Sequence, residues 1–366
     1  MKRLLTVAVL IMVAIGISAL EAVELGRIDY IEGGVTISRA GRTLSAPNID
    51  DPLLSGDLIR TASDGQVVIA MDKSTGMRGT VTVRPKSTLY LKLDQVKGEP
   101  RTTVDLLAGS MGSKVSKIAG APTVNVVTDS SVMGVRGTEY GVAVSVNDNT
   151  LVTCVEGSVS VSDGTQQLPV PAGHALEKQP GERLRLLPVA VSSVQQFTER
   201  WIADEIEAFK ADPVRALSDY AKRYNDLADK FAKAYAPFQN SPTPRKWAEE
   251  DRTGVKINPM DPTVLREKKE IAGYLLNIRK VLFLFERIYY RVDELSDLVA
   301  GTAAEKSLIA PGMTAGDFLA SVKADQDRLA AEVSRYRYIE SLYAARDTEG
   351  GVFGGEDDFF NSSDGF

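Results

Sequence analysis

The stretch Ile31-Glu32-Gly33-Gly34-Val35-Thr36-Ile37 recurs later in the chain as Val155-Glu156-Gly157-Ser158-Val159-Ser160-Val161. In both copies an apolar strand pattern is interrupted by a glycine turn and then resumes. A strand that changes direction at a corner needs a positive φ angle or a close backbone approach, which a Cβ atom would obstruct. The repeated unit therefore predicts stacked or wrapped β-layers.

Glycine corners and short apolar runs fill the surrounding sequence. Corners of the type Leu-x-x-Gly follow at residues 53–57 and 168–174, and a third lies at residues 106–110. In runs such as 67–71, 89–93 and 142–146, apolar residues alternate with polar ones or follow one another without interruption, as in β-strands. We predict an all-β domain over residues 23–190, folded as a roll or sandwich with glycine corners.

The composition changes sharply after residue 190. Residues 23–190 contain only three aromatic residues (Tyr30, Tyr90, Tyr140), whereas residues 191–346 contain 18. Asp212-Pro213 and Asp261-Pro262 each place a capping side chain before a proline at the first helical position. The pattern predicts an all-α helical bundle over residues 191–346.

Three apolar stripes with helical spacing support the bundle. Alternating steps of three and four residues place apolar side chains on one helix face, which can be buried against neighbouring helices. The prolines of residues 240–262 predict a long loop between two helices. The stripes comprise Leu217, Tyr220, Tyr224, Leu227 and Phe231; Ile271, Leu275, Ile278, Leu282, Phe285, Tyr289 and Val292; and Phe318, Val322, Leu329, Val333, Tyr336 and Ile339.

Residues 1–22 have the pattern of a secretory signal peptide. Lys2 and Arg3 precede an uncharged apolar run that ends at Leu20 among small residues. We therefore expect export to the bacterial periplasm. The alternative is an uncleaved inner-membrane anchor facing the periplasm, since the run has the minimum length that spans a bilayer.

The last twenty residues, 347–366, differ from everything before them. They carry six acidic residues, no basic ones, five glycines and four phenylalanines. We expect an acidic, disordered tail.

Charge and residue counts exclude several classes of function. One Cys and one His cannot supply the usual ligand sets of a zinc centre, so we expect no metal. A net charge of −6 argues against nucleic-acid binding. No glycine-rich phosphate loop is present, and we expect no cofactor.

Several motifs of the β half resemble the FecR domain in order and spacing over most of residues 26–178. They are Gly56–Thr61, the corner at 106–111, Val124–Thr128, the string Met133-Gly134-Val135-Arg136-Gly137-Thr138-Glu139-Tyr140, and Val155–Val159 with Ala172-Gly173. The family-motif residues are Gly56, Asp57, Thr61, Gly109, Gly134, Arg136, Gly137, Thr138, Glu139, Glu156, Gly157 and Gly173.

The resemblance implies a periplasmic, non-enzymatic β domain that senses or binds a protein partner. In the best-known members, a cytoplasmic segment precedes a membrane helix, and this segment controls a sigma factor. Here only three residues precede the apolar run, so we expect no direct control of a sigma factor by this chain.

Two groups of residues are candidates for chemistry. Cys154 and His174 could form a nucleophile and base, but Cys154 lies within the apolar run 151–155 and is expected to be buried. The cluster Arg136, Thr138 and Glu139 is either a binding surface or a structural turn. We favour the structural interpretation. In it, Arg136 makes a bidentate contact with a carboxylate (Glu139, Asp57 or Glu156), and the Thr138 side chain hydrogen-bonds to the backbone.

From these observations we expect no catalytic residues and no enzyme activity. The leading hypothesis is an exported binding or scaffold protein of the cell envelope, in which the β domain recognises a protein partner and the helices mediate assembly. The helices carry more aromatic rings than one apolar stripe requires, such as Phe283, Tyr290, Tyr338 and Tyr343. These rings suggest a face for partner binding or self-association. The alternatives are a periplasmic sensor acting through a separate membrane protein, and a hydrolase that uses Cys154.

Overall fold

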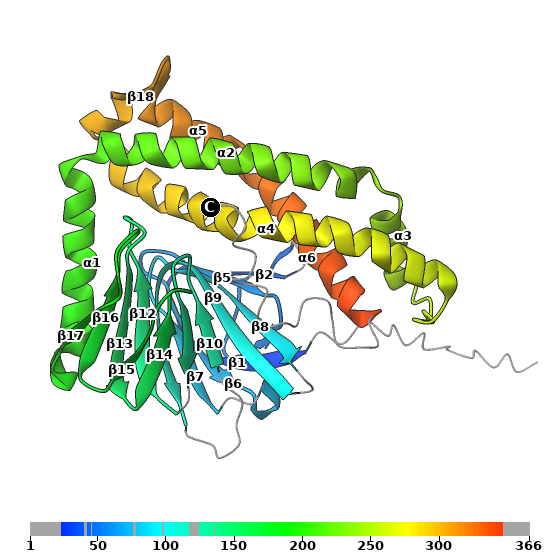
Figure 1. Ribbon diagram of the computed structural model, residues 1–366, viewed down its shortest axis with the longest axis horizontal. Coiled ribbons are helices and arrows are strands. Elements are labelled where there is room, and N and C mark those ends of the chain that lie inside the picture. Colours follow the sequence, from blue (N-terminus) through cyan, green and yellow to red (C-terminus); the bar gives the residue numbers. More distant parts are fainter. Residues whose placement is uncertain are drawn as a thin grey trace, which may run out of the picture.

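The β half consists of two layers of strands (Figure 1). The computed structural model describes residues 23–346 except 40–41, 45, 76–77, 97–98, 117–123 and 136. The first layer contains β1 (Glu24–Glu32), β4 (Pro52–Leu54), β6 (Gln66–Met71), β7 (Gly79–Val83), β12 (Glu139–Val144), β13 (Thr150–Glu156), β16 (His174–Lys178) and β17 (Arg185–Pro188). The second contains β2 (Val35–Arg39), β3 (Arg42–Leu44), β5 (Leu58–Thr61), β8 (Thr88–Val96), β10 (Val124–Val127), β11 (Val132–Val135), β14 (Ser158–Ser162) and β15 (Gln167–Pro171).

Strand β9 (Glu99–Val115) belongs to both layers. Its first part pairs with β8 and, in parallel, with β10, whereas its last residues pair with β7 and β12. The change occurs at Gly109, whose φ is +78°. The glycine corners of the sequence are thus the places where the chain crosses from one layer to the other.

The two copies of the internal repeat make the same crossing. One leads from β1 into β2 through Gly33, and the other leads from β13 into β14 through Gly157. Both glycines have positive φ, at 62° and 82°. The predicted all-β fold with glycine corners is confirmed.

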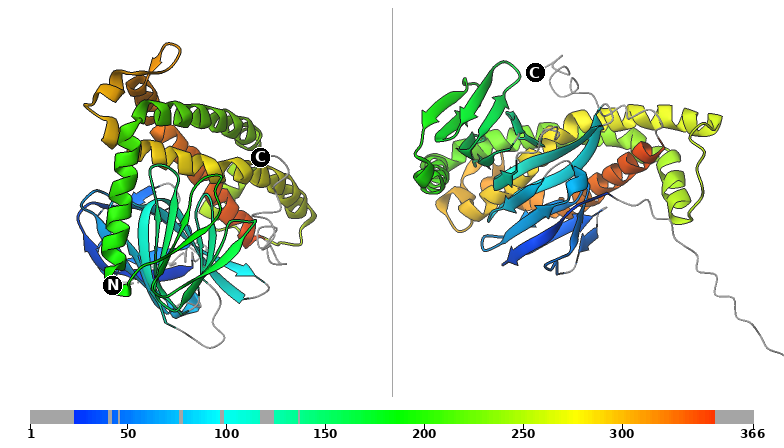
Figure 2. Two further views of the ribbon diagram at one scale, coloured as in Figure 1. Left: turned by 60° about the vertical axis from the view of Figure 1, so that its left-hand side comes forward. Right: turned by 90° about the horizontal axis from the view of Figure 1, so that it is seen from below.

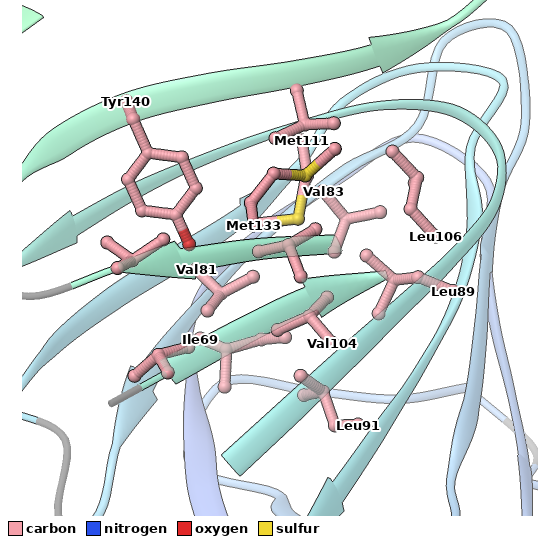
Figure 3. Close-up of a cluster of buried hydrophobic side chains, with 14 of the residues drawn as sticks. Ile69, Val81, Val83, Leu89, Leu91, Val104, Leu106, Met111, Met133 and Tyr140 are labelled. Atoms are coloured by element: carbon pink, nitrogen blue, oxygen red, sulfur yellow. The ribbon is translucent and has the colours of Figure 1, made fainter. Parts of the chain in front are cut away.

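A continuous apolar core fills the space between the layers. Side chains that alternate along each strand point inward, as in Val67, Ile69 and Met71 of β6. Figure 3 shows how residues of both layers meet, with Ile69 and Val81 close to Leu89 and Val104.

Helices α2 (Pro213–Asn240) and α4 (Pro262–Val299) pack side by side above one end of the β-layers (Figure 1). Both start at the predicted proline, because Asp212 accepts a bond from the Arg215 N–H and Asp261 from the Thr263 N–H. The predicted stripes are largely buried against each other. Helices α5 (Ala315–Ala324) and α6 (Gln326–Ala345) complete this helical core, and a hairpin of β18 (Leu308–Ala310) and β19 (Met313–Thr314) precedes them.

Three details of the helical region differ from the prediction. Residues 240–262 contain helix α3 (Thr243–Arg252), because Pro244 stands in the first turn, where no N–H bond is lost, and Trp247 is buried. The stripe from Phe318 to Ile339 is divided at Asp325 between α5 and α6.

Helix α1 (Val194–Ala211) is the third difference, since only its end, with Phe209, joins the helical core. It runs along the first β-layer, as the left-hand view of Figure 2 also shows, and Val194 and Trp201 pack on Ala143, Leu151 and Ala175. In the described part of the chain, no helix is both long and apolar enough to cross a membrane. The predicted signal peptide and acidic tail lie outside the described residues.

Candidate functional site

The corner between β11 and β12 holds the densest part of the predicted motif. Gly137 has a φ of +63°, and Thr138 is buried. A Cβ atom on Gly157, from the neighbouring corner, would lie 2.6 Å from Thr138 Cγ2 and 2.8 Å from Gly137 O. The two motif segments therefore pack directly on each other, and this contact requires glycine at position 157.

The polar side chains of this corner make other contacts than we expected. The Thr138 hydroxyl was expected to bind backbone, but it is buried and has no hydrogen-bond partner among the described residues. The Thr138 carbonyl instead accepts a bond from the Val115 N–H. Glu139 pairs with Lys114 at 2.8 Å, and this bond raises the pKa of Lys114. Arg136 lies outside the described residues, and Gly134 lies within β11.

Asp57 has a structural partner that the sequence did not reveal. Its completely buried carboxylate accepts Arg39 Nε at 2.8 Å and Arg39 Nη2 at 2.7 Å, and the Leu54 N–H donates to Oδ2. Arg39 therefore makes a bidentate contact with Asp57, one of the three carboxylates that we considered as partners of Arg136. Of the other two expected acceptors, Glu139 binds Lys114 and Glu156 is exposed.

The remaining motif residues support the backbone at other corners. The Thr61 hydroxyl donates to Arg84 O and accepts the Ser87 N–H. Gly56 and Gly173 have positive φ, and the Gly173 N–H donates to Cys154 O. These residues hold loops in place and present no group that could react.

Cys154 and His174 lie directly opposite each other on β13 and β16. The thiol is nevertheless turned into the apolar core, where it donates to Glu156 O, and burial raises its pKa. His174 Nδ1 contacts Ala172 O at 3.2 Å. The thiol is therefore held in its protonated, unreactive form.

A second site, which the sequence analysis missed, joins the β domain to α4. The Tyr90 hydroxyl donates to Glu286 Oε1 at 2.8 Å, and Arg337 Nη2 donates to Glu286 Oε2 at 2.6 Å. The Arg337 guanidinium also lies over the Tyr90 ring at 3.5 Å. Next to this group, buried Arg287 of α4 pairs with Asp105 of β9.

Asp148 is the centre of the other half of this interface. It accepts the Tyr220 hydroxyl at 2.8 Å and Arg223 Nη1 at 2.5 Å, and the Arg291 Nε lies 3.6 Å from its Oδ1. Arg291 further donates to Val144 O. Two helices, α2 and α4, are thus bound to one turn of the β domain.

Two neighbouring contacts strengthen the same junction. Glu205 of α1 accepts bonds from Ser145, Asn147 and Asn149. Val146 of this turn is a member of the helical core. The signal in the sequence was the spacing of Arg287, Arg291 and Glu294, which places three charges on one face of α4 beside its apolar stripe.

The additional aromatic side chains of the helices make contacts within the molecule. Phe283 lies under Arg287 and Tyr290 under Arg60, whereas the Tyr338 hydroxyl donates to Asp251. None of the aromatic residues of the helices is among the large exposed apolar side chains of the described part. Self-association or partner binding through these rings stays a prediction.

Fold and site define a two-part protein in which a glycine-cornered β domain is joined to helices through buried polar contacts. Residues 57–160 match the family described as FecR protein. This part of the β half thus resembles FecR domains, as its motifs indicated. No curated protein matches the sequence.

Solved structures show a distant similarity. Two crystal structures from Parabacteroides distasonis, at 1.65 and 2.50 Å resolution, are described as those of a candidate anti-sigma factor. They are 12% and 14% identical, with TM-scores of 0.32 and 0.26, and cover 38% and 37% of this chain. The chain spans 64% and 56% of their lengths.

Proposed function

We propose that this protein is an exported regulator of the bacterial cell envelope, which binds a protein partner through its FecR domain and has no catalytic activity of its own. The family match over residues 57–160 carries the proposal. Of the two binding roles, we favour the sensor that acts through a separate membrane protein. The signal-peptide pattern of residues 1–22 supports a periplasmic location.

Exposed apolar side chains of β1 and of the loop before β4 are available for the partner. They include Tyr30 and Ile49, which are 42% and 57% exposed. Exposed aromatic and apolar side chains favour protein contacts. We therefore place the partner surface around β1 and the loop before β4.

Photo-crosslinking in the living cell tests this proposal. A photoreactive residue at position 30 or 49 should form an adduct with a membrane-bound signalling protein or an outer-membrane receptor. The same residue at exposed Lys233 of α2 is the control and should give no such adduct. Adducts only with further copies of this chain would favour the scaffold role instead, and recovery in the cytoplasmic fraction would contradict the proposal.

A scaffold role has one supporting observation. Outside the β domain, Val255, Met260, Leu265 and Leu308 remain exposed, with Met260 at 67% and Leu308 at 65%. Such side chains could mediate assembly through the helices. The molar mass of the full chain over a range of concentrations tests this role, since it requires a stable oligomer.

A further inference from the structure

One end of the helical region combines exposed apolar and basic side chains. This basic tip comprises α3, the loop that follows it and the start of α4, which extend beyond the β domain (Figure 1). Val255, Met260 and Leu265 are 52%, 67% and 46% exposed. Residues 243–270 carry seven cations and six carboxylates. Within the described residues, four of these cations are exposed and have no acidic partner; they are Arg245, Lys256, Arg266 and Lys269.

The chain leaves α6 beside this tip. Buried Arg346 lies over the Trp247 ring of α3 at 4.5 Å, and its Nη2 donates to Glu250 at 3.1 Å. The carbonyl of the same Glu250 accepts the Val255 N–H at 3.0 Å. Two successive contacts therefore connect the last described residue to the exposed loop.

The sequence that follows Arg346 is complementary to the tip. Residues 347–366 contain six carboxylates, no cations and four phenylalanines. An extended chain covers about 3.3–3.6 Å per residue, so this segment can reach the whole tip. Carboxylates would neutralise the unpaired cations, and phenylalanine rings would cover the exposed apolar side chains.

We propose that residues 347–366 bind the basic tip of the same molecule. An anionic membrane is a less suitable occupant, because the acidic segment starts beside the tip and would repel it.

A spin label on the full-length chain tests the proposal. The label is attached at Ser362→Cys in a Cys154→Ala background, and paramagnetic broadening of the amide signals of residues 253–269 is measured by NMR. We expect strong broadening there that does not depend on protein concentration. Screening of surface charges at about 0.5 M salt should reduce it.

Charge reversal provides the control. The variant K256E/R266E/K269E should lose the broadening, whereas R215E/K222E/K233E, with the same change of charge on exposed α2 positions, should retain it. Circular dichroism checks that both variants fold, and the substituted side chains are exposed.

Four results would overturn the proposal. The tip signals could remain sharp, or they could stay broadened in K256E/R266E/K269E. Broadening could occur only between molecules when labelled and isotope-enriched chains are mixed, which would make a second copy the occupant. The fourth is binding of the tip to vesicles of anionic phospholipid while the tail makes no contact with it.

Discussion

The hydroxyl of Tyr90 and the carboxylate of Glu286 are 2.8 Å apart, although 196 residues separate them in the chain. Tyr90 belongs to the FecR domain and Glu286 to helix α4, so this bond connects the two parts directly. Both side chains are buried, and Glu286 also binds Arg337. The junction is thus a specific polar contact from which water is excluded.

Removing this bond alone should weaken the fold measurably. Tyr90→Phe keeps the ring under Arg337 but leaves Glu286 with one donor fewer, and a hydrogen bond to a charged group contributes about 1.5–3 kcal/mol. Urea unfolding should show a loss of this size. The control is Tyr30→Phe, whose hydroxyl bonds Glu32 at the exposed surface and should change stability by less than about 0.5 kcal/mol. Equal effects of the two substitutions would contradict a buried junction.

The corner glycines differ in a way that substitution can resolve. In Gly109→Ala the Cβ would lie 2.3 Å from Lys86 O, and the left-handed backbone adds about 1–2 kcal/mol of strain. Gly56 also has a positive φ, but no atom lies within 4 Å of its Cβ position. Gly56→Ala should therefore cost only the strain, and Gly109→Ala about 1–3 kcal/mol more. Unfolding midpoints check this order, and the reverse order would disprove the layer crossing at Gly109.

The pH dependence of stability should depend on Asp129. Burial and the nearby Asp148 raise its pKa, whereas Arg291 and Arg287 of α4 oppose the shift, and Arg223 of α2 also faces it. Because the folded state holds this proton more tightly than the unfolded chain, ionised Asp129 destabilises the fold at neutral pH. Asp129→Asn should stabilise the protein at about pH 7, and the gain should vanish as the pH falls to about 4.

The matched substitution Asp148→Asn should have the opposite effect. Asp148 accepts a bond from buried Tyr220 and pairs with buried Arg291, and breaking a buried pair costs about 3–5 kcal/mol. Urea midpoints between about pH 4 and pH 8 measure both variants. Destabilisation by Asp129→Asn at every pH would contradict the raised pKa of Asp129.

Much of the fold could be predicted from the sequence because its determinants are local. The glycine corners, the Asp-Pro helix starts and the apolar stripes each depend on residues a few positions apart. Helix α3 was missed because its only buried large side chain, Trp247, gives no periodic pattern. The partners Arg39 of Asp57 and Tyr90 of Glu286 could not be predicted, since topology alone brings them together.

The thiol of Cys154 should be inert in the folded protein. Burial raises its pKa, so iodoacetamide should modify it slowly at neutral pH and rapidly once urea unfolds the chain. Cys154→Ala and His174→Ala should both leave the crosslinks of position 30 unchanged. Rapid alkylation of the native protein, or loss of an activity in both variants, would instead support the hydrolase.

The two tryptophans of the chain test most directly whether the FecR domain and the helices behave as one unit. The indole of Trp201 donates to Glu177 of β16, and that of Trp247 to Glu267 of α4. In Trp201→Phe, the fluorescence of the remaining Trp247 therefore reports on the helical core. In Trp247→Phe, the fluorescence of the remaining Trp201 reports on the contact of α1 with the β-layer. The urea transitions of the two variants should coincide after each is corrected for the effect of its substitution on total stability. Two separate transitions, with one part folded while the other is unfolded, would contradict the account.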